Sequence, residues 1–236
     1  MSLGHPRVHL RRTDSTNSRA RELALAGAPH GTLVTASEQT AGRGRQGRIW
    51  TAPPDSCLLM SLLLRDSLPD SLPSLLPLIA AIAVCEAIGG QAAIKWPNDV
   101  VIVRDGGLAK LAGILVEGRP QQGWAVVGIG VNVAVRLDDL PAELRGTAAT
   151  LGRSRADIEP TLERLLSAFE RRLADPPQRT LEAWRARDGL RGRTVAWDAG
   201  NGRAEGIDGA GRLIVALADG GRASLSAGEV HLTKTE

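Results

Sequence analysis

The segment GRGRQGR (residues 42–48) combines glycine and arginine in a spacing that suits an anionic ligand. Glycine lets the backbone approach a ligand closely, and the forked N–H donors of arginine match phosphate oxygens. A Walker A loop is excluded because no Gly-Lys-Ser/Thr ends the segment, and a Rossmann fingerprint is excluded because Pro53 and Pro54 follow where a helix would begin. Three interpretations stay open: a clamp for nucleotide phosphates, an Arg-Gly segment that binds nucleic acid, and a solvated basic loop.

Two further segments carry charged side chains in places where a ligand would use them. In KWPND (95–99), Trp-Pro forces an extended or turn geometry, and the carboxylate of Asp99 at the mouth of a strand could hold Mg²⁺ with the help of water. The alternative is a turn formed by Asn98 and Asp99. Lys110 lies in the apolar run LAKLAGILVEG, where a buried ammonium is costly unless an anion pairs with it. It faces either a ligand or solvent, and Glu117 is a candidate structural partner.

The fourth signal is a pair of glycines, Gly128 and Gly130, in the run GIGVN. Glycine in a strand interior often marks a place where a ligand or another backbone lies against the strand. This signal is weak when it is taken alone.

The charge of the chain is biased toward its beginning. The formal net charge is only +3, but residues 1–50 hold eight arginines against three acidic residues, and only three of the 29 basic residues of the chain are lysines. A protein that coats nucleic acid would spread its excess over a whole face. The local excess therefore favours a small anionic ligand.

Composition is that of an ordinary globular protein, with 43% hydrophobic and 23% charged residues. Cys57 and Cys85 both lie in apolar runs, which favours buried reduced thiols over a disulfide or a metal pair and predicts a reducing compartment. No apolar run reaches the roughly 18–20 residues of a membrane span, and the N-terminus lacks the apolar stretch of a signal peptide. The sequence thus predicts a cytoplasmic protein that does not bind a membrane.

The elements that must position these residues follow from periodicity and turn signals. N-cap residues at 13–17 predict a helix that ends at Gly27, and residues 40–50 are predicted to be a flexible loop. The other predicted elements are a strand at 31–37, a buried strand at 57–64, an apolar helix at 75–90, four strands joined by hairpins between residues 92 and 132, a helix at 161–174 and a shorter one at 181–187.

The last 48 residues change character, because short β runs alternate there with Gly and Asp turns. This spacing is typical of a small all-β barrel. We therefore predict an α+β chain with two domains: residues 1–187, with a mixed or antiparallel sheet flanked by helices, and residues 188–236.

Taken together, the motifs resemble those of the biotin protein ligases (biotin–[acetyl-CoA-carboxylase] ligases). The similarity runs from about Thr13 to the C-terminus and rests on Ser15-Thr16-Asn17, SEQTAGRGRQGRIW (37–50), KWPND (95–99), KLAGILVEG (110–118) and GIGVN (128–132). It implies a mixed sheet flanked by helices, similar to class II aminoacyl-tRNA synthetases, followed by an SH3-like barrel. In the implied reaction, biotin attacks the α-phosphorus of ATP to give biotinyl-5′-AMP and pyrophosphate, and a lysine of a biotin carboxyl carrier protein then takes the biotinyl group and displaces AMP.

The resemblance also implies roles for single residues. Lys110 would contact the biotin carboxyl group and the α-phosphate, and with Arg45 it forms the implied catalytic pair. Trp50 would stack on adenine and close the Arg-rich loop like a lid. The implied ATP residues are Arg45, Arg48, Trp50, Asn98, Asp99, Lys110 and Asn132, with Asp99 linked to Mg²⁺. The implied biotin residues are Ser15, Thr16, Asn17, Gln39 (placed on the strand after the first helix), Gly42, Arg43, Gly44, Arg45, Lys110, Leu115, Gly128 and Gly130.

Two departures from the family and several partner expectations complete the interpretation. Only about a dozen residues precede Thr13, so the DNA-binding domain of larger members is expected to be absent, and with it DNA binding. Thr233 stands where some members offer an arginine to ATP, and the neighbouring Lys234 is a candidate substitute. The expected partner is the carrier protein of acetyl-CoA carboxylase or a related carboxylase, and a monomer or weak homodimer is expected. The alternatives are a lipoate protein ligase and, in a different class, a nucleic-acid-binding module that uses the Arg-Gly loop.

Overall fold

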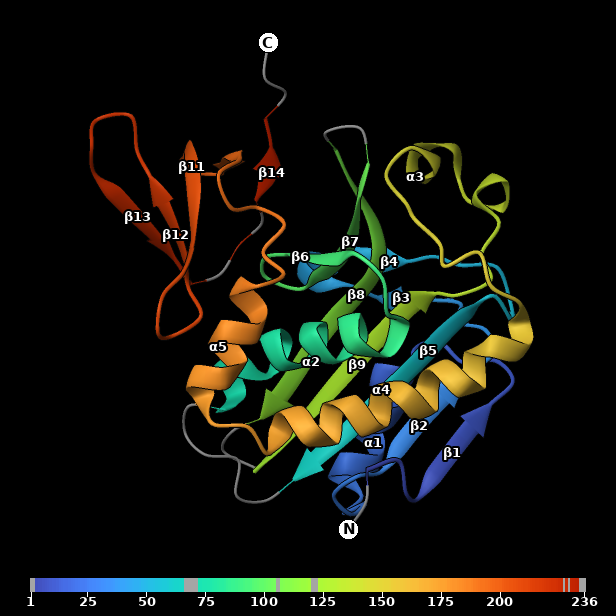
Figure 1. Ribbon diagram of the computed structural model, residues 1–236. Helices are drawn as coiled ribbons and strands as arrows, with labels where there is room; N and C mark the ends of the chain where they lie inside the picture. Colours follow the sequence, from blue (N-terminus) through green and yellow to red (C-terminus); the bar gives the residue numbers. More distant parts are fainter. Residues whose placement is uncertain are drawn as a thin grey trace.

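A seven-stranded mixed sheet forms the centre of the molecule (Figure 1). The computed structural model describes residues 3–65, 72–104, 107–119, 123–226, 228 and 230–233. The strand order is β1-β2-β5-β9-β8-β7-β6, and every pair is antiparallel except β1 with β2. The strands are β1 (Arg7–Leu10), β2 (Leu33–Ala36), β5 (Cys57–Arg65), β6 (Ala92–Lys95), β7 (Asp99–Arg104), β8 (Gly107–Arg119) and β9 (Trp124–Asn132).

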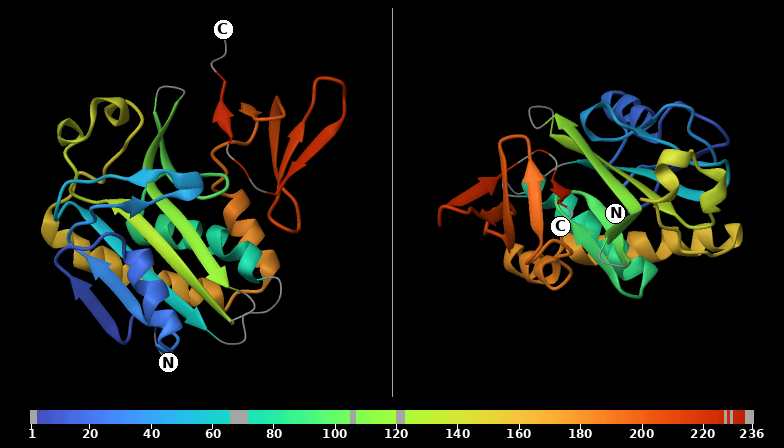
Figure 2. Two further views of the ribbon diagram at one scale, coloured as in Figure 1. Left: turned by 180° about the vertical axis from the view of Figure 1, so that it is seen from behind. Right: turned by 90° about the horizontal axis from the view of Figure 1, so that it is seen from above.

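Helices cover both faces of this sheet, as the front and back views show (Figures 1 and 2). Helix α1 (Thr16–Leu25) packs on one face, where Ala20 and Ala24 meet Leu63 of β5. On the opposite face lie α2 (Leu72–Ile88), α4 (Ile158–Leu173) and α5 (Pro177–Arg185). Because β5 is covered on both faces, its sequence is a continuous apolar run rather than an alternating one.

The last strands form a separate five-stranded antiparallel sheet in the order β13-β12-β11-β10-β14. These five elements confirm the predicted all-β character of the C-terminal part. The sheet lies beside α2 and α5 (Figure 2). Trp96 Nε1 donates to the carbonyl oxygen of Gly211 at 3.0 Å, and Arg185 donates to that of Ile207 at 3.0 Å. The strands are β10 (Thr194–Trp197), β11 (Gly200–Ile207), β12 (Leu213–Ala216), β13 (Arg222–Leu225) and β14 (His231–Leu232).

Most predicted elements are confirmed with small shifts of their ends, but the loop predicted at residues 40–50 is wrong in part. There β3 (Gly42–Arg43) and β4 (Ile49–Trp50) form a short antiparallel ladder, joined by a single 3₁₀ turn, η1 (Arg45–Gly47). Gln46 and Gly47 have φ angles of 52° and 76°, so the turn reverses the chain within a few residues. Too few residues pair for any apolar periodicity to show in the sequence.

The segment between β9 and α4 contains three short helices for which the sequence gives no signal. They are η3 (Leu137–Asp139), α3 (Ala142–Arg145) and η4 (Arg155–Asp157). Within the described ranges no helix is both long and apolar enough to cross a membrane.

Candidate active site

A cavity of about 430 Å³ lies on the face of the sheet opposite α2, within the usual size range of small-molecule sites. Its walls come from the start of α1, the β3–β4 hairpin, strands β7, β8 and β9, and the segment around α3. The predicted site residues, although far apart in sequence, meet here. Those that line the cavity are Ser15, Thr16, Asn17, Gln39, Arg43, Gly44, Arg45, Arg48, Trp50, Asn98, Asp99, Lys110, Leu115, Gly128, Gly130 and Asn132.

Two predicted placements need correction. Gly42 is not among the lining residues: a Cβ there would stand 2.5 Å from the Trp50 carbonyl oxygen and 2.9 Å from Gln39 Nε2, so this glycine lets the hairpin close. Gln39 does not lie on strand β2, which ends at Ala36, but beyond it in an isolated bridge with Thr13. The bridge brings the Gln39 side chain under the start of α1.

One end of the cavity has a polar floor formed at the first turn of α1. Ser15 is the N-cap residue, with extended backbone angles, and Thr16 and Asn17 are buried. The backbone N–H of Thr16 and its Oγ1 both lie within hydrogen-bonding distance of Gln39 Oε1, at 2.7 Å and 3.0 Å. Ser61 Oγ lies 2.8 Å from Thr16 Oγ1. The floor therefore consists of short polar side chains that are already paired with one another.

Asn17 is held on both sides of its amide. Its Nδ2 donates to Glu117 Oε2 at 2.9 Å, and its Oδ1 lies 2.6 Å from Ser61 Oγ. A Cβ at Gly128 would stand 2.0 Å from Asn17 Oδ1, far inside contact distance. Gly128 is therefore required for the Asn17 side chain to lie on strand β9.

A β-bulge in β8 turns Lys110 into the cavity. In the ladder with β7, Lys110 pairs with Val101 and Ala112 pairs with Val100, so Leu111 is an extra residue. Leu111 and Ala112 both belong to the core beneath the sheet. The bulge shifts the alternation by one residue, which lets Lys110 share a face with Gly113 and Leu115.

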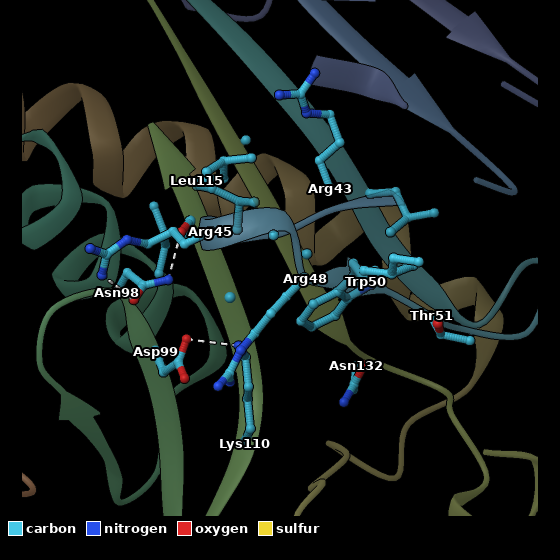
Figure 3. A pocket seen from close by; sticks show the side chains of 18 of the residues that line it. Arg43, Arg45, Arg48, Trp50, Thr51, Asn98, Asp99, Lys110, Leu115 and Asn132 are labelled. Carbon is cyan, nitrogen blue, oxygen red and sulfur yellow. Dashed lines mark hydrogen bonds and ion pairs between the residues drawn. The ribbon is translucent and has the colours of Figure 1, made fainter. Parts of the chain in front are cut away.

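Lys110 is paired with the carboxylate of the KWPND segment. Its Nζ lies 2.8 Å from Asp99 Oδ1 and 5.7 Å from the centroid of the Trp50 ring. Its side chain is 41% exposed. Figure 3 shows the Arg48 side chain extending toward the same two residues, Lys110 and Asp99. A cation with this access remains able to exchange its partner for an anionic ligand.

The hairpin reaches the sheet through two arginines. Arg45 Nη1 donates to Asn98 Oδ1 at 3.1 Å, and Asn98 Nδ2 donates to the Ile114 carbonyl oxygen. Arg43 points away from these residues (Figure 3) and donates to Glu117 Oε1 at 2.9 Å. The Arg-Gly segment is therefore held at two places, one on each side of the cavity.

Trp50 lies flat on the sheet between these contacts. A Cβ at Gly130 would stand 2.7 Å from the Trp50 ring, and one at Gly113 would stand 3.0 Å from it. The two glycines provide a shallow seat for the indole on neighbouring strands. An aromatic ring in such a seat offers its other face to a second flat group.

Asn132 lines the cavity, and both polar atoms of its side chain make hydrogen bonds within the protein. Its Nδ2 donates to the Ala149 carbonyl oxygen at 2.8 Å, and its Oδ1 accepts from the Cys57 thiol at 3.3 Å. Burial raises the pKa of Cys57 to about 12 and does the same for Cys85, so both stay thiols at neutral pH. The prediction of two buried free cysteines is confirmed.

The cavity is strongly cationic. Five cationic side chains and one carboxylate, Asp99, are among its described lining residues. Nowhere in the described chain do three or more His, Cys, Asp or Glu side chains gather in a way that could hold a metal ion. A single carboxylate does fit Mg²⁺ that arrives with phosphates, because this ion is usually held by one or two carboxylates plus substrate oxygens and water.

Several residues at the site were missed in the sequence. Ser61 is the one polar residue in the apolar run 57–64, and Gly113 interrupts the apolar run 111–116, so both carried a weak signal. Leu140 and Leu144, which line the cavity from the α3 segment, carried none.

Thr233, which the sequence resemblance places where some members offer an arginine, does not line the cavity. Its N–H donates to the Thr194 carbonyl oxygen at the start of β10. Lys234 lies outside the described residues.

The molecule combines a helix-flanked mixed sheet, a small all-β unit and a cationic cavity with a polar end and an aromatic side, which is the arrangement expected of a class of protein that binds an anionic ligand. Family comparison places the chain within that class. The model of the biotin/lipoate A/B protein ligase family matches residues 9–133, and that of the biotin protein ligase C terminal domain matches residues 192–232. The chain belongs to the biotin/lipoate A/B protein ligase family.

Individual relatives agree with this assignment. A biotin--[acetyl-CoA-carboxylase] ligase from Paracoccus denitrificans is 36% identical over 94% of this chain and 98% of its own length. The bifunctional ligase/repressor BirA of Bacillus spizizenii is also 36% identical, over 87% of this chain and 68% of its own length. Among solved structures, the biotin protein ligase from Aquifex aeolicus in complex with biotin and ATP has a TM-score of 0.79 and 26% identity, and the match covers 98% of this chain and 100% of that one.

Proposed function

We propose that the protein is an ATP-dependent biotin protein ligase, which makes biotinyl-5′-AMP from biotin and ATP and transfers biotin to a lysine of a biotin carboxyl carrier protein. The observation that carries the proposal is the convergence of Lys110, the two hairpin arginines Arg45 and Arg48, and the polar floor of α1 in one cavity. The names of the relatives support both the ligase activity and a carrier protein of acetyl-CoA carboxylase as the partner.

The first step brings two anions together, the biotin carboxylate and the α-phosphate of ATP, so positive charge and positioning must lower its barrier. Lys110 provides the charge at the centre of the cavity, and release of its contact with Asp99 would let its Nζ contact both reactants. Arg45 and Arg48 would bind the phosphates from the hairpin, and Asp99, with Asn98 beside it, would hold Mg²⁺ that accompanies ATP. Bound Mg²⁺ supplies charge neutralisation at the phosphate oxygens.

The polar floor supports biotin as the substrate. A ureido ring has one carbonyl acceptor and two N–H donors, and it needs partners of both kinds. Ser15, Thr16, Asn17 and Gln39 provide them beside apolar walls that include Leu115. The dithiolane ring of lipoate has neither an N–H group nor a carbonyl oxygen, so it would gain no hydrogen bonds from these side chains.

The second subsite accounts for adenine. Trp50 seated on Gly113 and Gly130 would stack on the base, and the hairpin that carries it would shield the adenylate from water. In the second step, the amine of the carrier lysine attacks the acyl carbon of biotinyl-AMP, the C–N bond forms, and AMP leaves as the C–O bond to the phosphate breaks.

The remaining parts of the proposal concern the whole chain. We propose a catalytic domain over residues 1–187 and a C-terminal domain over 188–236, a monomer or weak homodimer, a cytoplasmic location and no binding of DNA. Two buried free cysteines support a reducing compartment. Three of the eight arginines of residues 1–50, Arg43, Arg45 and Arg48, line the cavity together with two of the three lysines of the chain, which supports a small anionic ligand rather than DNA.

The test is direct biotinylation of a carrier domain. The purified protein, biotin, ATP and Mg²⁺ are incubated with a biotin carboxyl carrier domain, and the intact mass of the carrier is measured. We expect a mass increase of one biotinyl group (biotin less water) on one lysine. An unmodified carrier, or preferential addition of lipoate when both acids are supplied, would contradict the proposal.

A further inference from the structure

Glu117 lies behind the cavity and contacts two of its lining residues from different elements. Its Oε2 accepts from Asn17 Nδ2 on α1, and its Oε1 accepts from Arg43 Nη2 on the hairpin, both at 2.9 Å. Its side chain is 19% exposed and is not among the residues that line the cavity. Arg21 approaches the same carboxylate at 3.5 Å.

The carboxylate decides which way the Asn17 amide faces. An ionised carboxylate has acceptors only, and so has the Leu115 carbonyl oxygen, which lies 3.4 Å from the same Asn17 nitrogen. The nitrogen must therefore face Glu117, and Oδ1 must face the Ser61 hydroxyl over Gly128. Asn17 thus presents an acceptor, not a donor, on the side where Gly128 lines the cavity.

The Gln39 amide is the second amide of the floor. Its orientation does not depend on Glu117, and it presents its donor, whereas Asn17 presents its acceptor. The backbone N–H of Thr16 can only donate, and it does so to Gln39 Oε1 at 2.7 Å. Gln39 therefore directs its Nε2, a donor, away from Thr16 and toward Gly42. With the two amides fixed, the floor has one acceptor end and one donor end.

We infer that Glu117 is a positioning residue that sets the hydrogen-bond polarity of the ureido subsite by holding the Asn17 amide in one orientation while it ties Arg43 to the same point. This inference rests on the proposed function, because the ligand is taken to be biotin. Glu117 acts through Asn17 and Arg43 and does not touch the reacting atoms.

The substitution Glu117→Gln is the sharpest test, because it keeps the shape of the side chain and changes only its chemistry. A glutamine amide has one acceptor oxygen and one donor NH₂. Either Asn17 Nδ2 or Arg43 would then face a donor, and the Asn17 amide loses the group that holds its orientation. Glu117→Asp keeps an acceptor-only group with a shorter reach. Glu159→Gln is the matched control, because Glu159 pairs with Arg7 and does not line the cavity.

The experiment measures, for wild type and the three variants, the affinity for biotin and for an N-methylated biotin that lacks a ureido N–H, by calorimetry, together with KM for ATP and Tm. For Glu117→Gln we expect biotin binding to weaken about tenfold or more, as for loss of one hydrogen bond to a charged group, and its preference for biotin over the methylated analogue to shrink. Glu117→Asp should keep that preference. Glu159→Gln should keep both the wild-type affinity for biotin and the wild-type preference for biotin over the methylated analogue. KM for ATP should stay within about threefold throughout, the scale of a change that touches no contact of the nucleotide.

Three results would overturn the inference. Wild-type biotin affinity in Glu117→Gln would exclude a role in positioning. Equal losses of biotin and ATP affinity, with a Tm far below that of Glu159→Gln, would show a merely structural role. If the wild type itself does not bind biotin, the proposed function is overturned as well. This outcome can be told apart from the first two, because in those the wild type binds biotin and only the role of Glu117 is wrong.

Discussion

Lys110 is the residue on which the chemistry of the cavity depends most directly. It meets the Asp99 carboxylate and the face of Trp50, and its backbone N–H donates to the Thr147 carbonyl oxygen at 2.7 Å. The backbone contact fixes the strand, and the side-chain contacts are of the kind that a phosphate or carboxylate can replace. Its role is therefore separable from the stability of the fold.

Lys110→Ala should reduce the rate of biotinyl-AMP formation on the order of 10²–10³-fold, the usual effect of removing one group that stabilises developing charge. Pyrophosphate release checks this outcome. Tm should change little, because the lost ion pair is 41% exposed on the lysine side and such pairs contribute little to stability. Near-normal turnover would remove Lys110 from the role we assign to it.

Gly128→Ala tests the close approach of Asn17 to strand β9. The added methyl group would overlap Asn17 Oδ1, so the amide has to leave its position between Ser61 and Glu117. We expect biotin affinity to fall about tenfold or more, as for loss of one or two buried hydrogen bonds, and calorimetry measures it. Gly146→Ala is the control, because a Cβ there meets nothing within 4 Å, and it should bind biotin as the wild type does.

Asp188 provides a pH-dependent contribution to stability. Burial raises its pKa above the ordinary value of 3.8, although the Leu190 N–H donates to its Oδ1 at 2.8 Å. Oδ2 has no hydrogen-bond partner in the described part of the chain. Between the ordinary and the raised pKa the folded state binds more protons than the unfolded state, so this group's contribution to stability falls as pH rises through that window.

Asp188→Asn should therefore raise Tm at neutral pH, and the difference from wild type should shrink as the pH approaches the ordinary carboxyl pKa. Asp157→Asn is a control of opposite sign. Hydrogen bonds from Ser154 lower the pKa of Asp157, so its contribution to stability is present above the ordinary pKa and is lost as pH falls. Asp157→Asn removes this contribution and should therefore lower Tm at neutral pH. Thermal unfolding at several pH values decides both, and a neutral-pH Tm of Asp188→Asn below that of wild type would contradict the first expectation.

At the scale of elements, the β3–β4 hairpin connects the two halves of the cavity. Arg43 ties it to Glu117, Arg45 ties it to Asn98, and Trp50 seats it on Gly113 and Gly130. Only two residue pairs form its ladder. Its order therefore depends on these side-chain contacts more than on its own backbone hydrogen bonds.

Trp50→Ala should weaken ATP binding by about 1–3 kcal/mol, the usual value of one base–aromatic stack. It should also accelerate hydrogen exchange of residues 42–50, because the hairpin loses its seat on the sheet. Trp50→Phe is the conservative control, since it keeps a ring over the same glycines, and it should retain most of both properties. Unchanged ATP affinity in Trp50→Ala would exclude the adenine role of Trp50.

Elements with many residues in one pattern were predictable, and those defined by a few contacts were not. The apolar runs of β5 and α2 and the hairpins of β6 to β9 follow from periodicity and turn residues. The bulge at Leu111, which turns Lys110 into the cavity, could not be seen in the sequence, because residues 108–116 are apolar at nearly every position and show no alternation that an extra residue would interrupt. Glu117 could be named as a partner, but its bond to Asn17 depends on the tertiary packing of α1 against β5 and β9, which brings Asn17 next to β8. The motifs thus identified the site residues, while the contacts among them required the structure.

At the scale of the whole molecule, two sheets share one core. Leu190, Val195 and Leu213 of the C-terminal part belong to the same apolar cluster as Ile79 and Ile82 of α2. The two sheets on either side of residue 188 therefore share one hydrophobic core, and a domain boundary at that residue stays a prediction. A part that shares its core with a larger one is expected to unfold with it.

Calorimetry should accordingly show one unfolding transition for the full chain, with equal calorimetric and van't Hoff enthalpies. Trp96→Phe tests the contact between the parts, because it keeps a buried ring and removes the hydrogen bond to the Gly211 carbonyl oxygen. The loss should cost about 1 kcal/mol and lower Tm by about 2–4 °C for a chain of this size. The whole transition should shift as one. If the C-terminal strands instead melt separately, at a lower temperature than the rest in wild type or in the variant, the shared core does not couple the two sheets. The separation at residue 188 would then be one of folding units as well as of sheets.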